Sequence, residues 1–285
     1  MSPNDFVCAA EDEAQAVVRS AASAWHGSRG SERLDIPLSV MSAVNLIRPL
    51  GCAPGEFGNR TTRLSTYSAI GWLAEVWARF LRLRPDLVPA AYPVAAWLLG
   101  QERRAAEADL GGAHAILCRV VPKVVQWTAI SGGVGELDLL GELWQAPAVG
   151  QPLEARAQFC TPRDVAAVGS ALLGEVPKFG STVRGTCVGT GGLFLSLTWR
   201  MRAGEADVAS VTRIGSGVDE LVITPAVVNA HRWGLGGNVI LSAVDVLPGC
   251  PDHHGIVHRE HAITVARTVQ ATATARNLLT AGATP

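Results

Sequence analysis

A glycine-rich segment in the second half of the chain constrains the fold more than any other feature. It reads Gly-Thr-Cys-Val-Gly-Thr-Gly-Gly over residues 185–192, between a β-prone run at 181–184 and an apolar segment at 193–201 that is predicted as a helix. A glycine loop in this place lets backbone amides approach a ligand at the positive end of the helix dipole. A tight strand-to-helix turn without a ligand is the simpler interpretation of the same residues, and it stays open at this point.

The segments around this loop alternate between helix and strand. A helix is predicted at 163–173, a second strand at 211–214, a helix at 221–233 and a third strand at 239–241. Strand, glycine turn, helix, strand, helix and strand form the order of a βαβαβ unit in a doubly wound α/β fold. We therefore predict a partial Rossmann-like α/β core that stops at about three strands.

The rest of the chain is predicted to be helical. Apolar residues in the first half recur with a period near 3.6, which is typical of amphipathic helices. The predicted helices there are 11–25, 35–47, 64–83, 95–108 and 112–121, and the glycine-rich segment 128–135 is predicted as a loop. Residues 255–279 also have a helical composition, with Ile263, Ala266, Val269 and Ala273 along one stripe.

This pattern predicts three parts. They are an all-helical N-terminal domain at 1–148, the α/β core at 149–252, and a C-terminal helix with a tail at 253–285. A length of 285 residues is enough for about two domains.

Composition limits the function classes. Hydrophobic residues make up 48% of the chain, which is enough to bury real cores, and no apolar run reaches the roughly 18 residues of a membrane span. Acidic residues precede the first basic one, the wrong charge order for a signal peptide, so we expect a cytoplasmic protein without membrane contact. The net charge is −1 and neither half is basic, so composition does not favour DNA binding by the chain alone. The six cysteines are widely separated and are predicted to be free thiols.

Four segments together resemble one known family. Residues 156–162, Arg-Ala-Gln-Phe-Cys-Thr-Pro, are similar to the Gly-Gln-Phe-Tyr-Thr-Pro segment of adenine-specific (N-6) DNA methyltransferases of the type I restriction–modification kind. The loop 185–192 resembles that family's Asp-Pro-Ala-Cys-Gly-Thr-Gly-Gly. Residues 214–221 resemble the strand that ends at the cofactor ribose, 228–236 resemble the helix after it, and 240–247 resemble the third strand with its Gly-Asp-Thr-Leu end. Order and spacing agree over about 90 residues.

The resemblance implies an S-adenosylmethionine (SAM)-dependent methyltransferase core that transfers a methyl group to the exocyclic amine of adenine in DNA. It also implies DNA as a partner, either directly or through a second subunit of a restriction–modification or phage-defence assembly. The residues that the resemblance assigns to the cofactor pocket are Phe159, Thr161, Pro162, Gly189, Thr190, Gly191, Asp219 and Asp245.

The departures from the family are as informative as the matches. The acid that opens the family's glycine loop falls on Gly185, and the acid that holds the ribose falls on Gly217. Hydrogen bonds from the ribose to a carboxylate contribute roughly 1.5–3 kcal/mol each, so the loss of the ribose-holding acid at Gly217 predicts a cofactor affinity about 10–100-fold weaker. Asp219 is the acid nearest to the second position, two residues further on.

The motif that performs the chemistry is also missing. The family holds the extruded adenine with an Asn/Asp-Pro-Pro-Phe/Tyr motif, and this chain contains no Pro-Pro dipeptide. We therefore assign no catalytic residue. Two alternatives to an active enzyme stay open: a catalytically inactive methyltransferase-like interaction module, and one half of a split methylase whose partner supplies the remaining strands.

Two further groups of residues have the residue types of a reactive thiol and of a metal site. Cys187 lies near a helix N-terminus, where a thiol becomes more acidic, but the sequence offers no base beside it, so we expect it to fill the turn. A C-terminal cluster has the spacing of metal ligands, although a solvated helix start with Asp252 as its cap explains it as well, and we assign no metal-binding residue. The cluster consists of Cys250, Asp252, His253, His254, His258 and His261.

Overall fold

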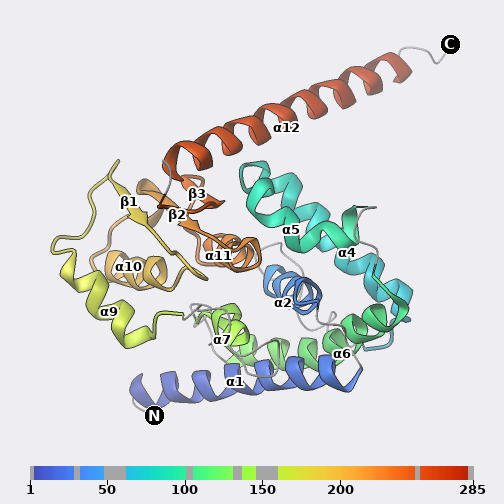
Figure 1. The fold of residues 1–285 in the computed structure, drawn as a ribbon, viewed down its shortest axis with the longest axis horizontal. Helices are drawn as coiled ribbons and strands as arrows, with labels where there is room; N and C mark the ends of the chain where they lie inside the picture. The colour runs from blue at the N-terminus through green and yellow to red at the C-terminus, as the bar shows by residue number, and fades with distance from the viewer. Residues whose placement is uncertain are drawn as a thin grey trace.

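The computed structural model describes residues 3–28, 33–47, 62–100, 105–130, 137–145, 160–247 and 251–281. Within these ranges the protein is a mixed α/β structure, mostly helical, with a small three-stranded parallel sheet (Figure 1). No helix in the described ranges combines the length and the apolar character that a membrane crossing requires.

The first half is helical, as predicted. Its elements are α1 (Pro3–Gly27), α2 (Asp35–Leu46), α4 (Thr66–Leu83), the short 3-10 helix η1 (Pro85–Leu87), α5 (Val88–Leu99), α6 (Glu107–Ile130) and α7 (Leu139–Gln145).

Several predicted boundaries in this half are wrong: α1 begins at Pro3 rather than at 11, α5 ends at Leu99 rather than at 108, and α6 begins at Glu107 rather than at 112. Helix α5 begins at Val88 rather than at 95, because a proline in the first helical turn lacks only an N–H that would have no acceptor there. Helix α6 continues to Ile130, so residues 128–130 of the predicted loop are helical, and Pro122 lies inside that helix without ending it.

The second half contains the predicted alternation of helix and strand. Helix α9 (Arg163–Leu172) is followed by β1 (Thr182–Gly185), α10 (Gly192–Ala203), the 3-10 turn η3 (Val208–Ser210), β2 (Thr212–Gly217), α11 (Glu220–Arg232) and β3 (Val239–Ala243). The strands are parallel in the order β1-β2-β3, with Gly185 beside Gly215 and Gly217 beside Ala243. Because parallel strands share a direction, the carboxyl ends of all three meet at one edge of the sheet.

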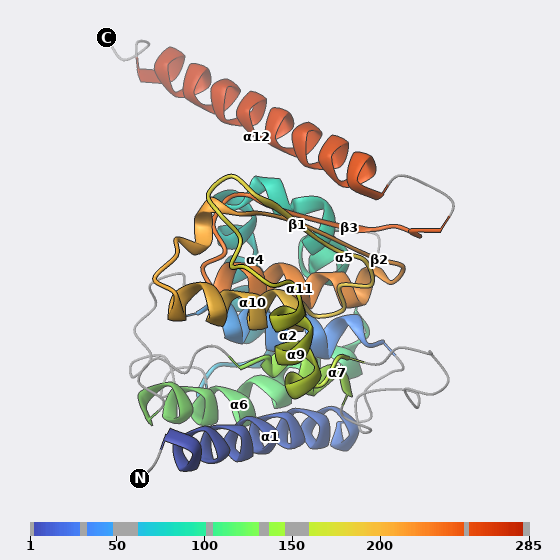
Figure 2. The ribbon, with the colours of Figure 1, turned by 90° about the vertical axis from the view of Figure 1, so that its left-hand side faces the viewer.

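The sheet lies between two helical layers (Figure 2). Successive residues of β3 point to opposite faces: Ile240 lies toward Gly255 of α12 (Pro251–Ala281), while Leu241 lies toward Gly215 beside the ring of Phe194 in α10. Helix α11 packs on the same face as α10, against β2 and β3. Figure 1 shows α12 continuing away from the body of the molecule beyond this contact.

Helix α11 is the element on which both halves pack. Every residue from Val222 to Ala230 is buried, because one side of the helix faces the sheet and the other faces α2, α5 and α7. The Thr224 hydroxyl donates to the carbonyl of Ala90 at 2.8 Å, and Arg232 donates to Asn45 at 2.7 Å. The buried apolar side chains form one connected cluster from α1 to β3. The division into domains at 148 and 252 stays a prediction.

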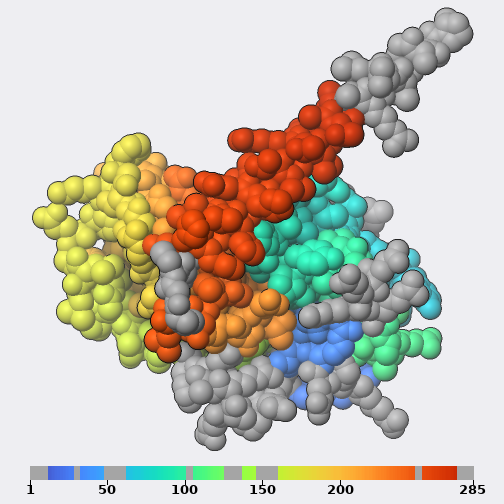
Figure 3. All heavy atoms as spheres, turned by 45° about the horizontal axis from the view of Figure 1, so that its top comes forward, coloured from blue at the N-terminus to red at the C-terminus, as the bar shows by residue number. Residues whose placement is uncertain are grey.

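Helix α12 differs from its prediction in detail. It begins at Pro251, two residues before the predicted boundary, so Asp252 lies in its first turn and pairs with Arg184 of β1 at 2.5 Å. The predicted apolar stripe is only partly covered, since Val269 is 63% exposed and Ala273 is also exposed. The space-filling view shows the helix standing out from the surface (Figure 3).

Candidate functional site

The glycine loop connects β1 to α10 through three residues with positive φ, two of which are glycines. Gly189 has φ +56° and Gly191, the N-cap of α10, has φ +97°, a region that favours glycine. A Cβ on Gly191 would lie 3.2 Å from the Trp233 ring, so the loop also packs too closely there for a side chain. Cys187 adopts φ +56° and is exposed. The loop therefore places the first amides of α10, which lack intrahelical acceptors, at the edge of a cavity.

This cavity has a volume of about 400 Å³, within the range of small-molecule sites. It lies where the glycine loop and α10 meet α9 on one side and α1 and α7 on the other. Its lining residues are Ala14, Gln15, Leu137, Asp138, Gly141, Glu142, Gln145, Cys160, Thr161, Pro162, Arg163, Ala166, Cys187, Val188, Gly189, Thr190, Gly192, Leu193, Leu195, Ser196 and Trp199.

A carboxylate from the helical half holds the glycine loop in place. Asp138, directly before α7, accepts from the Gly141 amide at 2.8 Å and from the Asn229 side-chain amide at 2.7 Å. Its second oxygen accepts from the Thr190 hydroxyl at 2.5 Å, and Asn229 also donates to the Thr190 carbonyl at 2.9 Å. We call Asp138, Thr190 and Asn229 the loop clamp, because they join α7, the glycine loop and α11.

Burial raises the pKa values of two ionisable groups in the cavity. Desolvation raises the pKa of the Asp138 carboxyl, while its hydrogen bonds from Thr190, Gly141 and Asn229 act in the opposite direction. Burial, together with the nearby charge of Asp138, raises the pKa of the Cys160 thiol to about 12. Cys160 is therefore a neutral thiol and not a nucleophile at neutral pH.

The structure brings together half of the predicted cofactor residues. Thr161, Pro162, Gly189 and Thr190 line the cavity, and Gly191 lies between two lining residues, covered by Trp233. Phe159 lies outside the described residues.

The two predicted acids lie elsewhere. Asp219 is the N-cap of α11 and accepts from the Leu221 amide at 2.8 Å, and it does not line the cavity. Asp245 is exposed after β3 and accepts from the Leu247 amide at 2.9 Å. Both carboxylates satisfy local backbone amides, as Asp residues commonly do at helix starts and turns.

Apolar side chains stand at the two glycines that replace the family's acids. A Cβ on Gly185 would lie 3.3 Å from the Phe194 ring, and a Cβ on Gly217 would lie 3.3 Å from Ile223. The chain thus has packed hydrocarbon beside the carboxyl ends of β1 and β2.

The C-terminal histidines stack instead of converging on one point. The rings of His254 and His258 lie 4.0 Å apart with an interplanar angle of 28°, and burial, followed by the charge of His258, lowers the pKa of His254. Cys250 is outside the described residues. Within the described ranges, no three His, Cys, Asp or Glu side chains are arranged to hold a metal ion.

Sequence reasoning missed the loop clamp. Asp138 carries one local signal, an acidic residue directly before the apolar helix 139–145, which is the pattern of an N-cap. Its partners Thr190 and Asn229 are 52 and 91 residues away, and no periodicity connects them.

Comparisons with protein-family models, with curated proteins and with solved structures yield no match for this chain.

Proposed function

We propose that the cavity at the glycine loop binds S-adenosylmethionine and that the chain is a methyltransferase-like module without methyl-transfer activity of its own. The observation that carries the proposal is the position of the cavity, at the N-terminus of α10 and against Thr161, Pro162, Gly189 and Thr190. These four residues come from two segments that the family resemblance selects independently of the structure.

The charges of the cavity suit this ligand. S-adenosylmethionine carries a sulfonium and an ammonium cation together with one carboxylate. The carboxylates of Asp138 and Glu142 and the guanidinium of Arg163 line the same cavity. Amides at a helix N-terminus favour an anion, so the ligand carboxylate is expected near Gly192 and the cations near Asp138.

The strand topology supports the proposal that the sheet is part of a Rossmann-like fold. A parallel order β1-β2-β3 with α10 and α11 on one face is half of a doubly wound Rossmann-like sheet. Ligands of such sheets bind outside the carboxyl ends of the strands, and the glycine loop follows the carboxyl end of β1.

One observation favours the split-enzyme alternative over an isolated module. Strand β1 pairs with β2 alone among the described residues, so its other edge is open. The segment that leads into β1, α9 and the loop after it, exposes Val168 by 60%, Leu172 by 81% and Phe179 by 89%. An open strand edge together with an exposed apolar face is typical of a surface that another polypeptide covers.

Cofactor binding is tested by thermal unfolding with and without 1 mM S-adenosylmethionine. A ligand at ten times its dissociation constant stabilises the folded state by about 1.4 kcal/mol, which raises the Tm by about 2–4 °C. Thr161→Trp fills the cavity mouth and should abolish this shift, whereas Thr268→Trp on the exposed part of α12 should retain it. Equal shifts for both variants, or none for the wild type, would refute the site.

The two catalytic alternatives are separated by a transfer assay with labelled methyl donor and adenine-containing duplex DNA. The chain alone should transfer no label under either alternative, and transfer by the chain alone would contradict both. Transfer that appears with a purified second subunit, and is lost in Val168→Glu/Leu172→Glu with the Tm shift intact, supports the split enzyme.

A further inference from the structure

We propose that an open groove between α1 and α6 binds the phosphodiester backbone of a nucleic acid. The groove has a volume of about 410 Å³ and is lined by Ala16, Arg19, Ser20, Ser23, Arg119 and Lys123. The proposed function supplies the substrate class on which this inference rests, and the groove adds the surface that would contact it.

Three cations line this groove and no carboxylate does. Arg19, Arg119 and Lys123 are exposed, and none of them forms an ion pair with another described residue. By contrast, the exposed cations Arg82 and Lys178 each pair with a glutamate. In a chain whose net charge is −1, a gathering of cations without acidic partners is a local excess of positive charge.

The side chains of the groove keep hydrogen-bond donors available for an anion. Arg119 donates to the Ser23 hydroxyl at 3.4 Å, and Arg19 donates to Gln15 at 3.4 Å, so both guanidinium groups keep most of their N–H donors for another partner. The hydrogen of the Ser23 hydroxyl meets no acceptor among the described residues.

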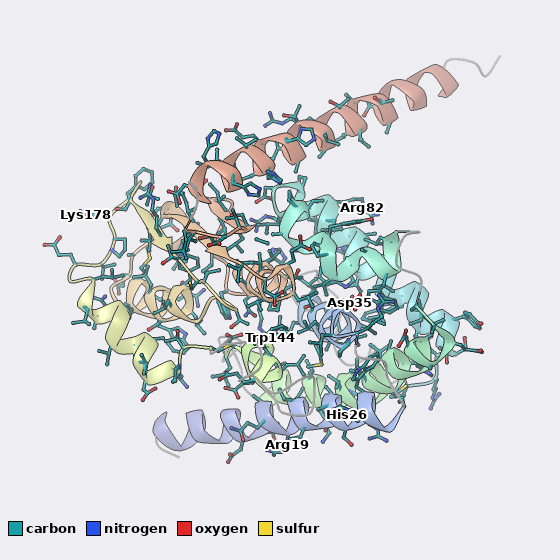
Figure 4. All side chains as sticks on the ribbon, viewed as in Figure 1. Arg19, His26, Asp35, Arg82, Trp144 and Lys178 are labelled. Carbon is teal, nitrogen blue, oxygen red and sulfur yellow. The ribbon has the colours of Figure 1, made fainter. Side chains whose placement is uncertain are left out.

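The arrangement suits a polymer better than a single ion. Arg119 and Lys123 are four residues apart on α6, which places them about 6 Å apart along the helix axis on one face. Arg19 of α1 lines the same open groove, so three positive charges from two helices lie along it. Figure 4 shows Arg19 on the outer side of α1 and Lys178 at a distant end of the molecule.

The groove lies next to the proposed cofactor cavity. Gln15, which accepts from Arg19, also lines that cavity, so one turn of α1 connects the two sites. An anionic membrane is the less favoured partner, because the groove offers only Ala16 as an apolar contact and no large side chain to enter a bilayer.

The test is fluorescence anisotropy of a labelled 20-base-pair duplex against salt, without S-adenosylmethionine. Replacing Arg19, Arg119 and Lys123 with alanine should reduce the slope of log K against log salt by about 1 per cation and weaken binding at least about 10-fold at low salt. The control, Arg82→Ala/Lys178→Ala/Arg267→Ala, makes the same change in net charge at exposed sites elsewhere and should keep the wild-type slope.

An absence of DNA binding by the wild type, or an equal loss of slope in both triple variants, would overturn the proposal. Displacement of DNA by an equal phosphate concentration of inorganic phosphate would indicate a single-ion site, and tighter binding to phosphatidylserine vesicles would indicate a membrane; both overturn it. Because the assay contains no cofactor, its failure is distinguishable from a failure of S-adenosylmethionine binding.

Discussion

At the scale of single residues, Asp138 carries most of the geometry of the site. It accepts from Gly141, Thr190 and Asn229, and thereby connects three elements that are distant in sequence. Asp138→Ala leaves those donors without their acceptor, so we expect the free energy of unfolding in urea to fall by about 3 kcal/mol. Asp138→Asn keeps one acceptor and should lose about half as much. Equal stability of both variants and the wild type would contradict the clamp.

The buried carboxyl of Asp138 also makes the stability of the folded state depend on pH. Burial raises the folded-state pKa of Asp138 above its ordinary value of 3.8. The folded state therefore binds the Asp138 proton more tightly than the unfolded state does. The stability that this proton contributes is fully present below pH 3.8 and is lost as pH rises through the raised pKa. Relative to Asp138→Asn, the wild type should thus lose stability as urea titrations move from pH 4 to pH 8. A constant difference over that range would show that the pKa is not raised.

Gly141 tests how closely the clamp packs. A Cβ there would lie 2.3 Å from an Asp138 carboxylate oxygen and 2.8 Å from the Thr190 hydroxyl, so Gly141→Ala must displace the clamp. We expect a loss of about 1–3 kcal/mol in the free energy of unfolding. Gly71→Ala is the matched control, because its Cβ meets no atom within 4 Å in α4, and it should stabilise the protein by about 0.4–1 kcal/mol. A neutral Gly141→Ala variant would contradict the packing.

At the scale of elements, local patterns predict which elements exist better than they predict where those elements end. The period-3.6 apolar pattern and the glycine loop identify α4, α10 and α11 closely, since their signals lie within each segment. The start of α5 and the end of α6 were missed because Pro89 and Pro122 are breakers only in some positions. The clamp was missed because it depends on contacts across tens of residues, which no local pattern records.

Strand β2 depends on a buried guanidinium. Arg213 is fully buried in the central strand and donates to the carbonyls of Val208 at 2.8 Å and Val211 at 3.2 Å, which fixes η3 beside the sheet. Burial, with the nearby charge of Arg202, lowers its pKa to about 10, so it stays charged at neutral pH.

Substitution of this arginine tests the connection between η3 and β2. Arg213→Ala leaves two carbonyls without a donor and opens a cavity, so we expect a loss of about 3 kcal/mol in urea unfolding. Arg213→Met fills the same volume with an apolar side chain and should cost less. Because both variants lose the guanidinium's hydrogen bonds, their difference reports the cavity alone, and an Arg213→Met variant no more stable than Arg213→Ala would contradict this expectation.

At the scale of the whole molecule, α11 makes the helical half and the sheet a single structure. It is buried against the sheet on one side and against α2, α5 and α7 on the other. We therefore expect one unfolding transition, with tryptophan fluorescence, which samples Trp77 and Trp233 in the two halves, coinciding with circular dichroism. Two separate transitions, or a folded fragment of residues 149–252, would instead support two independent domains.

The central claim is that the cavity beside the glycine loop holds S-adenosylmethionine, and isothermal titration calorimetry tests it most directly. We expect saturable heat with one site per chain for the wild type, and a binding isotherm that disappears in Thr161→Trp but not in Thr268→Trp. With both family acids replaced by Gly185 and Gly217, the affinity is expected to be weak. An absence of heat for the wild type at millimolar ligand, where binding free energies are only about −4 kcal/mol, would contradict the claim.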